Sequence, residues 1–96
     1  MTIEYLQKKI EGIFLSLGFT IEFVGTKQLR YLRYQNCHCK ISFLEAWGAF
    51  VIESADNLEE AEKELLEDGE LYYMNIPEDE LLHQIEEDVR EYYMQQ

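Results

Sequence analysis

The chain has 96 residues, enough for one domain with one hydrophobic core, and its formal net charge is −12. Hydrophobic residues make up 47% of it and aromatic residues 14%, which is more apolar matter than a disordered acidic tail contains. No stretch approaches the ~20 apolar residues that cross a bilayer, and residues 1–6 lack the features of a signal peptide. We therefore expect one folded domain, residues 1–96, in the cytoplasm.

The negative charge is concentrated in the second half of the chain. Between Glu53 and Glu91, Asp and Glu outnumber Lys and Arg sixteen to two, whereas residues 1–50 hold four acids and six bases. This half would repel nucleic-acid phosphate and anionic lipid, so direct binding of either through it is disfavoured. A basic protein is the partner that the charge favours.

The first predicted element is an amphipathic helix over residues 2–17. Thr2 can cap its start and Gly18 can end it. Its apolar residues recur at helical spacing, which indicates one buried stripe. These residues are Ile3, Leu6, Ile10, Ile13, Phe14 and Leu17.

Four strands are expected next, over residues 19–23, 29–34, 37–43 and 49–54. Phe19, Ile21 and Phe23 alternate with polar residues, which predicts one buried face for the first strand. The second strand mixes aromatic and basic residues, so its inward face is ambiguous. The nearly continuous apolar run of the fourth favours a position in the middle of the sheet. Short connections favour an antiparallel meander.

Trp47 lies in the connection between the third and fourth predicted strands. Its neighbours Ala46, Gly48 and Ala49 are small enough to admit a large ring. We therefore expect Trp47 to be largely buried.

Two helices are expected in the acidic half. Asn57 and Glu60 form a capping box for the first, whose inner stripe is Leu58, Ala61 and Leu65 and which Asp68 and Gly69 end. A connector, residues 70–76, follows, and Pro77 opens the last helix. The predicted fold is thus α+β, with one antiparallel sheet of about four strands in the order helix, four strands, helix, helix. The last helix should bury Leu81, Leu82, Ile85, Val89 and Tyr92, and one of Tyr72 or Tyr73 should also be in the core.

No reaction is predicted from the sequence. Cys37, His38 and Cys39 are adjacent on a predicted strand, so His38 points away from the cysteines, and a closed zinc site needs four ligands. We expect free buried thiols at both cysteines, surface positions for His38 and His83, and no metal or cofactor. The many carboxylates lie at exposed helix phases without a pocket that would shift their pKa, so no catalytic residue is assigned.

Tyrosines interleaved with the acids suggest a protein-binding surface. Rigid aromatic residues within a ring of charge commonly anchor protein interfaces. The connector and the start of the last helix contain both acidic and aromatic residues. Residues 70–76 carry no predicted helix or strand, and loops held by a rigid scaffold commonly bind partners. The predicted partner-binding residues are Glu67, Asp68, Glu70, Tyr72, Tyr73, Glu78 and Asp79.

The C-terminal half resembles a known class of proteins. The capped acidic helix, the run from Glu67 to Tyr72 and the Pro77-led acidic helix ending in Glu91, Tyr92 and Tyr93 are similar to the corresponding parts of small acidic α+β immunity proteins of bacterial polymorphic toxin systems. That resemblance implies binding and neutralisation of a cognate toxin, and the charge favours a basic one. Two alternatives stay open, a phage-encoded inhibitor of the anti-CRISPR type that mimics nucleic acid, and a small enzyme or ligand-binding domain.

Overall fold

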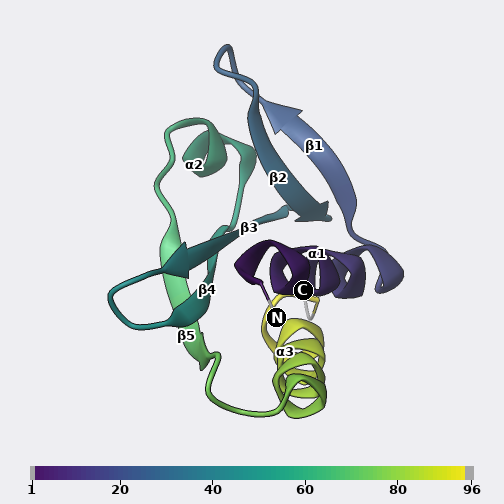
Figure 1. Ribbon diagram of the computed structural model, residues 1–96. Coiled ribbons are helices and arrows are strands. Elements are labelled where there is room, and N and C mark those ends of the chain that lie inside the picture. Colours follow the sequence, from purple (N-terminus) through teal and green to yellow (C-terminus); the bar gives the residue numbers. More distant parts are fainter. Residues whose placement is uncertain (1, 95–96) are drawn as a thin grey trace.

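In residues 2–94, which the computed structural model describes, three helices pack on one five-stranded antiparallel sheet (Figure 1). The predicted α+β class is confirmed, but the sheet has five strands where about four were expected. The elements in chain order are α1 (Ile3–Ser16), β1 (Thr20–Val24), β2 (Leu29–Tyr34), β3 (Cys37–Leu44), β4 (Ala49–Ala55), α2 (Leu58–Glu62), β5 (Glu67–Tyr73) and α3 (Glu78–Tyr92).

The strands lie side by side in sequence order, from β1 at one edge to β5 at the other. Every neighbouring pair is antiparallel, so the predicted meander is confirmed. β4 is an interior strand, as its apolar run indicated, and its first four residues are all buried. In β2, Tyr31 and Leu32 point to opposite faces and both are buried. Both faces of the sheet are covered at β2, so its sequence does not alternate between one buried and one exposed side.

α1 and α3 cover one face of the sheet, called here the helical face. Thr2 caps α1 by accepting a hydrogen bond from the Tyr5 amide, and the chain turns out of the helix at Gly18, whose φ is +103°. Both ends of α1 agree with the prediction. The core on this face includes Leu6, Ile10 and Phe14 of α1, Leu32, Cys39, Phe50 and Ile52 of the sheet, and Leu81, Ile85 and Val89 of α3.

The C-terminal end of α3 differs from the prediction in one residue. Tyr92 was expected in the core, but its side chain is 55% exposed and Tyr93 is buried in its place. The buried stripe advances by four residues at each step from Leu81 to Tyr93, so position 93 lies directly above Val89 on the helix.

α2 covers only one end of the opposite, second face. Ala61 packs there with Val24, Tyr31 and Ala55, and the Tyr31 hydroxyl donates a 2.8 Å hydrogen bond to the Ala61 carbonyl. The Asn57 cap is confirmed, because its side chain accepts from the Glu60 amide. The predicted length is wrong, since α2 ends at Glu62 and the chain reverses at Glu64, with φ +56°. The predicted inner residue Leu65 therefore lies outside the helix and is exposed, and Leu58, the first residue of α2, is exposed as well.

The segment predicted as the end of a helix followed by a connector is an edge strand. β5 pairs with β4 from Ser54–Glu67 to Ala49–Tyr73, with a bulge between Val51 and Glu53. A Cβ built on Gly69 would lie 2.5 Å from the Tyr93 hydroxyl and 3.0 Å from the Ile52 carbonyl oxygen. A glycine is therefore needed where Tyr93, at the end of α3, packs against β5.

The other edge strand, β1, is less covered than its alternation suggests. Phe19 is buried and stacks edge-on against Phe14 with ring centres 4.9 Å apart. Ile21 and Phe23, predicted to share its buried face, are 41% and 57% exposed. These two positions lie on the helical face but toward the free end of the β1–β2 hairpin, which extends away from the two helices (Figure 1).

Candidate protein-interaction surface

β5 places three carboxylates along the free edge of the sheet. Glu67, Asp68 and Glu70 are all exposed, and none of them forms an ion pair with another residue in the described range 2–94. β4 occupies one side of the strand, so the backbone groups on the other side face outward. The edge is therefore both strongly negative and open to a partner.

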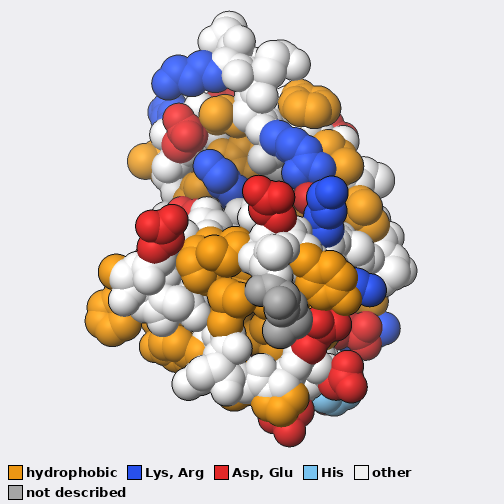
Figure 2. Space-filling view, viewed as in Figure 1, with side chains coloured by type: hydrophobic (Ala, Val, Ile, Leu, Met, Phe, Trp, Pro, Cys, Tyr) orange, Lys and Arg blue, Asp and Glu red, His pale blue; other side chains and the backbone are white. Residues whose placement is uncertain are grey.

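The two arginines of β2 are neutralised within the first half of the chain. Arg30 donates two hydrogen bonds to the Glu11 carboxylate, at 3.1 and 2.6 Å, and this raises the pKa of its guanidinium. Arg33 pairs with Glu22 at 3.2 Å. Figure 2 shows most of the Lys and Arg side chains over the β1–β2 hairpin and α1, with a few acids among them, whereas acidic side chains lie along one side of α3. The charge asymmetry of the sequence is thus also an asymmetry of the surface.

The first turn of α3 adds three more acids, at Glu78, Asp79 and Glu80. They lie at the positive end of the helix dipole, which stabilises them there. Glu78 is half-buried and accepts a 3.4 Å hydrogen bond from the Tyr5 hydroxyl of α1, so it is partly engaged inside the molecule. Asp79 is exposed and remains available to a partner.

Carboxylates of β5 and α3 act electrostatically on Tyr92, at the other end of α3. Glu91, Glu70 and Asp88, in that order of effect, raise the pKa of the Tyr92 hydroxyl by their negative charge. Negative charge from a strand and from a helix is therefore felt at the hydroxyl of one half-exposed tyrosine. This arrangement was not predicted, because the sequence placed Tyr92 in the core.

Tyr72 cannot contact a partner directly. It is 2% exposed, and its hydroxyl donates a 2.7 Å hydrogen bond to Asp88 of α3. Burial and this bond raise the pKa of Tyr72. The predicted partner-binding role of Tyr72 is corrected to a structural one, in which it ties α3 to β5.

The remaining predicted residues fall into two groups. Six strand steps of about 3.3 Å separate Glu67 from Tyr73 by roughly 20 Å. Glu67, Asp68 and Glu70 lie toward the start of β5, whereas Tyr73 lies at its end, a few residues before Glu78 and Asp79. The structure therefore brings Glu70 together with the end of α3, but it does not bring all seven predicted residues into one patch.

Trp47 is exposed, contrary to prediction. Its side chain is 64% exposed in the turn between β3 and β4. The small neighbours Ala46 and Gly48 belong to this turn, where Gly48 adopts φ +58°, and they form no pocket. Ala49 pairs with Tyr73, and the Met74 amide donates to the Gly48 carbonyl at 3.1 Å. Trp47 and the 42% exposed Tyr73 consequently flank the same junction at the end of β5.

The cysteines are free and buried, with their Sγ atoms 3.7 Å apart. The contact between the two thiols, together with burial, raises the pKa of Cys39. His38 points to the second face, as expected, but it is 3% exposed and so is not the surface residue that was predicted. His83 is exposed as predicted and lies 2.9 Å from Glu87. Within residues 2–94, no group of three or more His, Cys, Asp or Glu could hold a metal ion.

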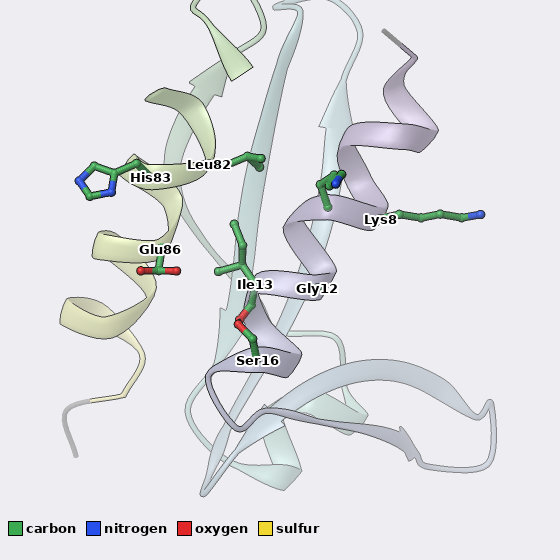
Figure 3. A pocket seen from close by; sticks show the side chains of 8 residues that line it. Lys8, Gly12, Ile13, Ser16, Leu82, His83 and Glu86 are labelled. Atoms are coloured by element: carbon green, nitrogen blue, oxygen red, sulfur yellow. The ribbon is translucent and has the colours of Figure 1, made fainter. Parts of the chain in front are cut away.

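A groove of about 410 Å³ runs between α1 and α3. Figure 3 shows Ile13 and Leu82 pointing into it, while Lys8 and His83 point away. Two apolar side chains thus line the space between the helices, and two of the polar side chains at its rim turn outward.

None of the helices in the described part of the chain has the length and apolar character needed to cross a membrane. Comparisons with protein-family models, with curated proteins and with solved structures found no match for this chain. Its function is therefore argued from the surface described above.

Proposed function

We propose that this protein binds and neutralises a basic protein, as an immunity protein binds its toxin, through the edge of β5 and the adjoining side of α3. One observation carries the proposal. Glu70, Asp88 and Glu91 place negative charge near the hydroxyl of the half-exposed Tyr92, and none of the three forms an ion pair with a base among residues 2–94. Unpaired carboxylates beside an exposed aromatic residue are suited to Lys and Arg side chains.

Solubility and edge protection explain only part of this charge. A net charge of magnitude about 2–8 keeps a small domain in solution, and a few charges suffice to prevent pairing of an edge strand. The chain carries −12, and self-repulsion at that level destabilises a fold. The exposed aromatic residues Trp47, Tyr73 and Tyr92 serve neither purpose, which supports a binding role for the surface they border.

The identity of the partner class follows from the sequence resemblance and from the charge. Immunity proteins of this kind are small, acidic and α+β, and a toxin that acts on nucleic acid is basic because it must bind phosphate. Negative charge would steer such a toxin into contact, with association rates up to ~10⁸–10⁹ M⁻¹s⁻¹ at low salt. The free cysteines suit a reducing cytoplasm as the place of encounter. We assign no catalytic residue and no cofactor.

Co-purification from the native operon tests the proposal. Wild-type protein should retain a basic protein encoded beside it, and a variant carrying Glu67→Lys, Asp68→Lys and Glu70→Lys should lose it. A control carrying Glu4→Lys, Glu59→Lys and Glu62→Lys makes the same change in net charge on α1 and α2, outside β5, and should retain the partner. Equal retention by both variants would refute the assignment of the surface. Retention of a host enzyme that acts on nucleic acid would favour the phage-inhibitor alternative over the toxin.

A further inference from the structure

A cavity of about 460 Å³ opens on the second face of the sheet, beneath α2 and toward the β1 edge. It is separate from the acidic edge, because β1 and β5 are the two opposite borders of the sheet. Its walls include Glu22 and Val24 of β1, Arg33 of β2, His38 of β3, and Leu58 and Glu62 of α2. The volume lies within the ~300–1,000 Å³ of ordinary ligand pockets.

The buried wall of this cavity is the imidazole of His38. Its Nδ1 lies 2.9 Å from the Asn36 carbonyl oxygen, and since a carbonyl can only accept, Nδ1 carries the proton. Within residues 2–94, every side-chain nitrogen or oxygen that is fully enclosed has a hydrogen-bond partner. Nε2 of His38 has no partner in that range, so it is not one of the enclosed atoms. Nε2 therefore reaches solvent, and the cavity is the space that His38 lines. In the neutral ring this nitrogen is a hydrogen-bond acceptor.

The β2–β3 turn holds both nitrogen-bearing side chains in place. Arg33 and His38 are cross-strand partners, so their side chains lie next to each other on the second face. The Gln35 carbonyl accepts a 2.7 Å hydrogen bond from Arg33 Nε, while the neighbouring Asn36 carbonyl accepts from His38. Gln35 adopts φ +52° in this turn, which is an uncommon conformation for a residue other than glycine. The site is thus preorganised before any ligand arrives.

The charge and polarity of the walls select the ligand. Arg33 is paired with Glu22 at 3.2 Å, so these two charges largely cancel. Glu62 has no basic partner in the described range and leaves the cavity with an excess negative charge. The open acceptors are then the Glu62 carboxylate and His38 Nε2, and the apolar walls are Val24 and Leu58. An anion would meet two carboxylates here, within a chain whose net charge is −12.

We propose that this cavity binds an organic cation, namely an ammonium or guanidinium group on an apolar stem. The cation would donate to Glu62 and to His38 Nε2, and its stem would pack on Leu58 and Val24. Lys and Arg side chains of a protein and free alkylamines share this chemistry. The site does not depend on the acidic edge of β5, so it would exist whether or not the proposed function is correct.

Titration with n-butylammonium chloride, followed by NMR, tests the site. Saturable binding should shift the Val24 and Leu58 amides and the ¹⁵Nε2 resonance of His38, whereas sodium butyrate at equal ionic strength should not. Glu62→Gln should weaken binding at least threefold, and so should Leu58→Ser. Both residues are exposed, so the fold should be retained, as the amide spectrum would show. The matched control on the same helix is Glu59→Gln, which should leave the affinity unchanged.

Two outcomes would overturn the proposal. One is a response that does not saturate or that butyrate reproduces, and the other is equal weakening by Glu59→Gln and Glu62→Gln. A second ligand, N-acetyl-lysine-N-methylamide, identifies the source of the cation. Tighter binding of this compound than of butylammonium assigns the cavity to a side chain of a protein partner, and tighter binding of the free amine assigns it to a small molecule.

Discussion

At the scale of single residues, the pattern of residue types predicted burial correctly at some positions. At others, burial depends on contacts between residues that are distant in sequence. Phe14 and Ile85 are buried as predicted, because each lies at the centre of a regular helical stripe. Trp47 and Tyr92 were placed in the core and are exposed. Trp47 lies in a turn, which has no hydrophobic periodicity. Tyr92 is the last residue of its helix, so the apolar spacing can be followed on its N-terminal side alone.

Gly69→Ala should destabilise the protein by about 1–3 kcal/mol, as overpacking of a close contact does. The added Cβ would lie 2.5 Å from the Tyr93 hydroxyl and 3.0 Å from the Ile52 backbone. Urea unfolding measures the change. Gly12→Ala is the control, because nothing lies within 4 Å of its Cβ in α1, and it should stabilise the helix by about 0.5–1 kcal/mol. Combining Gly69→Ala with Tyr93→Phe should recover part of the loss, and an unchanged stability of Gly69→Ala would disprove the contact.

Trp47→Ala should change the free energy of unfolding by less than about 0.5 kcal/mol, as expected for an exposed side chain. The buried Phe50→Ala is the comparison and should cost about 3–5 kcal/mol. Trp47 is the sole tryptophan of the chain, so its fluorescence reports directly on its exposure. Emission near that of free tryptophan, readily quenched by acrylamide, is expected. A blue-shifted, unquenched emission would contradict the exposed position.

At the scale of elements, β5 is the strand that the sequence pattern did not predict. Its residues Glu67 to Glu70 are poor strand formers, and a gap of only four residues separates α2 from the strand. The strand forms because Leu71, Tyr72 and Tyr73 register against the interior strand β4, and a non-local pairing of this kind leaves no local signal. The start of α2, by contrast, was predicted correctly, because the Asn57 cap is a local interaction.

The link between β5 and α3 predicts a loss of stability at alkaline pH. Burial raises the pKa of Tyr72 and of Tyr93, so both stay neutral in the folded state where the unfolded chain begins to ionise. Stability should be complete below about pH 10 and fall above it, by up to ~1.4 kcal/mol per pH unit for each tyrosine. Urea unfolding at several pH values above 9 measures the slope.

Tyr72→Phe separates this titration from a general loss of packing. The variant removes the hydroxyl that bonds to Asp88, and its stability should fall less steeply above pH 10 than that of wild type. Val89→Ala destabilises the same helix without removing a titrating group, so it should keep the wild-type slope. Equal slopes for Tyr72→Phe and wild type would show that the Tyr72 pKa is not raised by folding.

At the scale of the whole molecule, the uneven distribution of charge along the sequence becomes an uneven distribution of charge on the surface. The bases of β2 are paired within the first half, whereas the carboxylates of β5 and the C-terminal end of α3 have no basic partner in residues 2–94. The sequence was sufficient to predict this asymmetry, the α+β class and the meander. It did not predict that Glu70 of β5 acts on Tyr92 of α3, because that depends on how α3 lies across β5.

The salt dependence of association with the co-purified partner tests the central claim most directly. The wild-type association rate should fall steeply as ionic strength rises, because charges farther apart than about 10 Å are screened at 0.1 M salt. The variant with Lys at Glu67, Asp68 and Glu70 should associate slowly with little dependence on salt, and its complex should dissociate faster. The control with Lys at Glu4, Glu59 and Glu62 should keep the wild-type dissociation rate and most of the salt dependence. If the β5 variant matches wild type in both rates and in salt dependence, the acidic edge is not the recognition surface, and the Arg30 to Lys40 side of the sheet becomes the place to look for it.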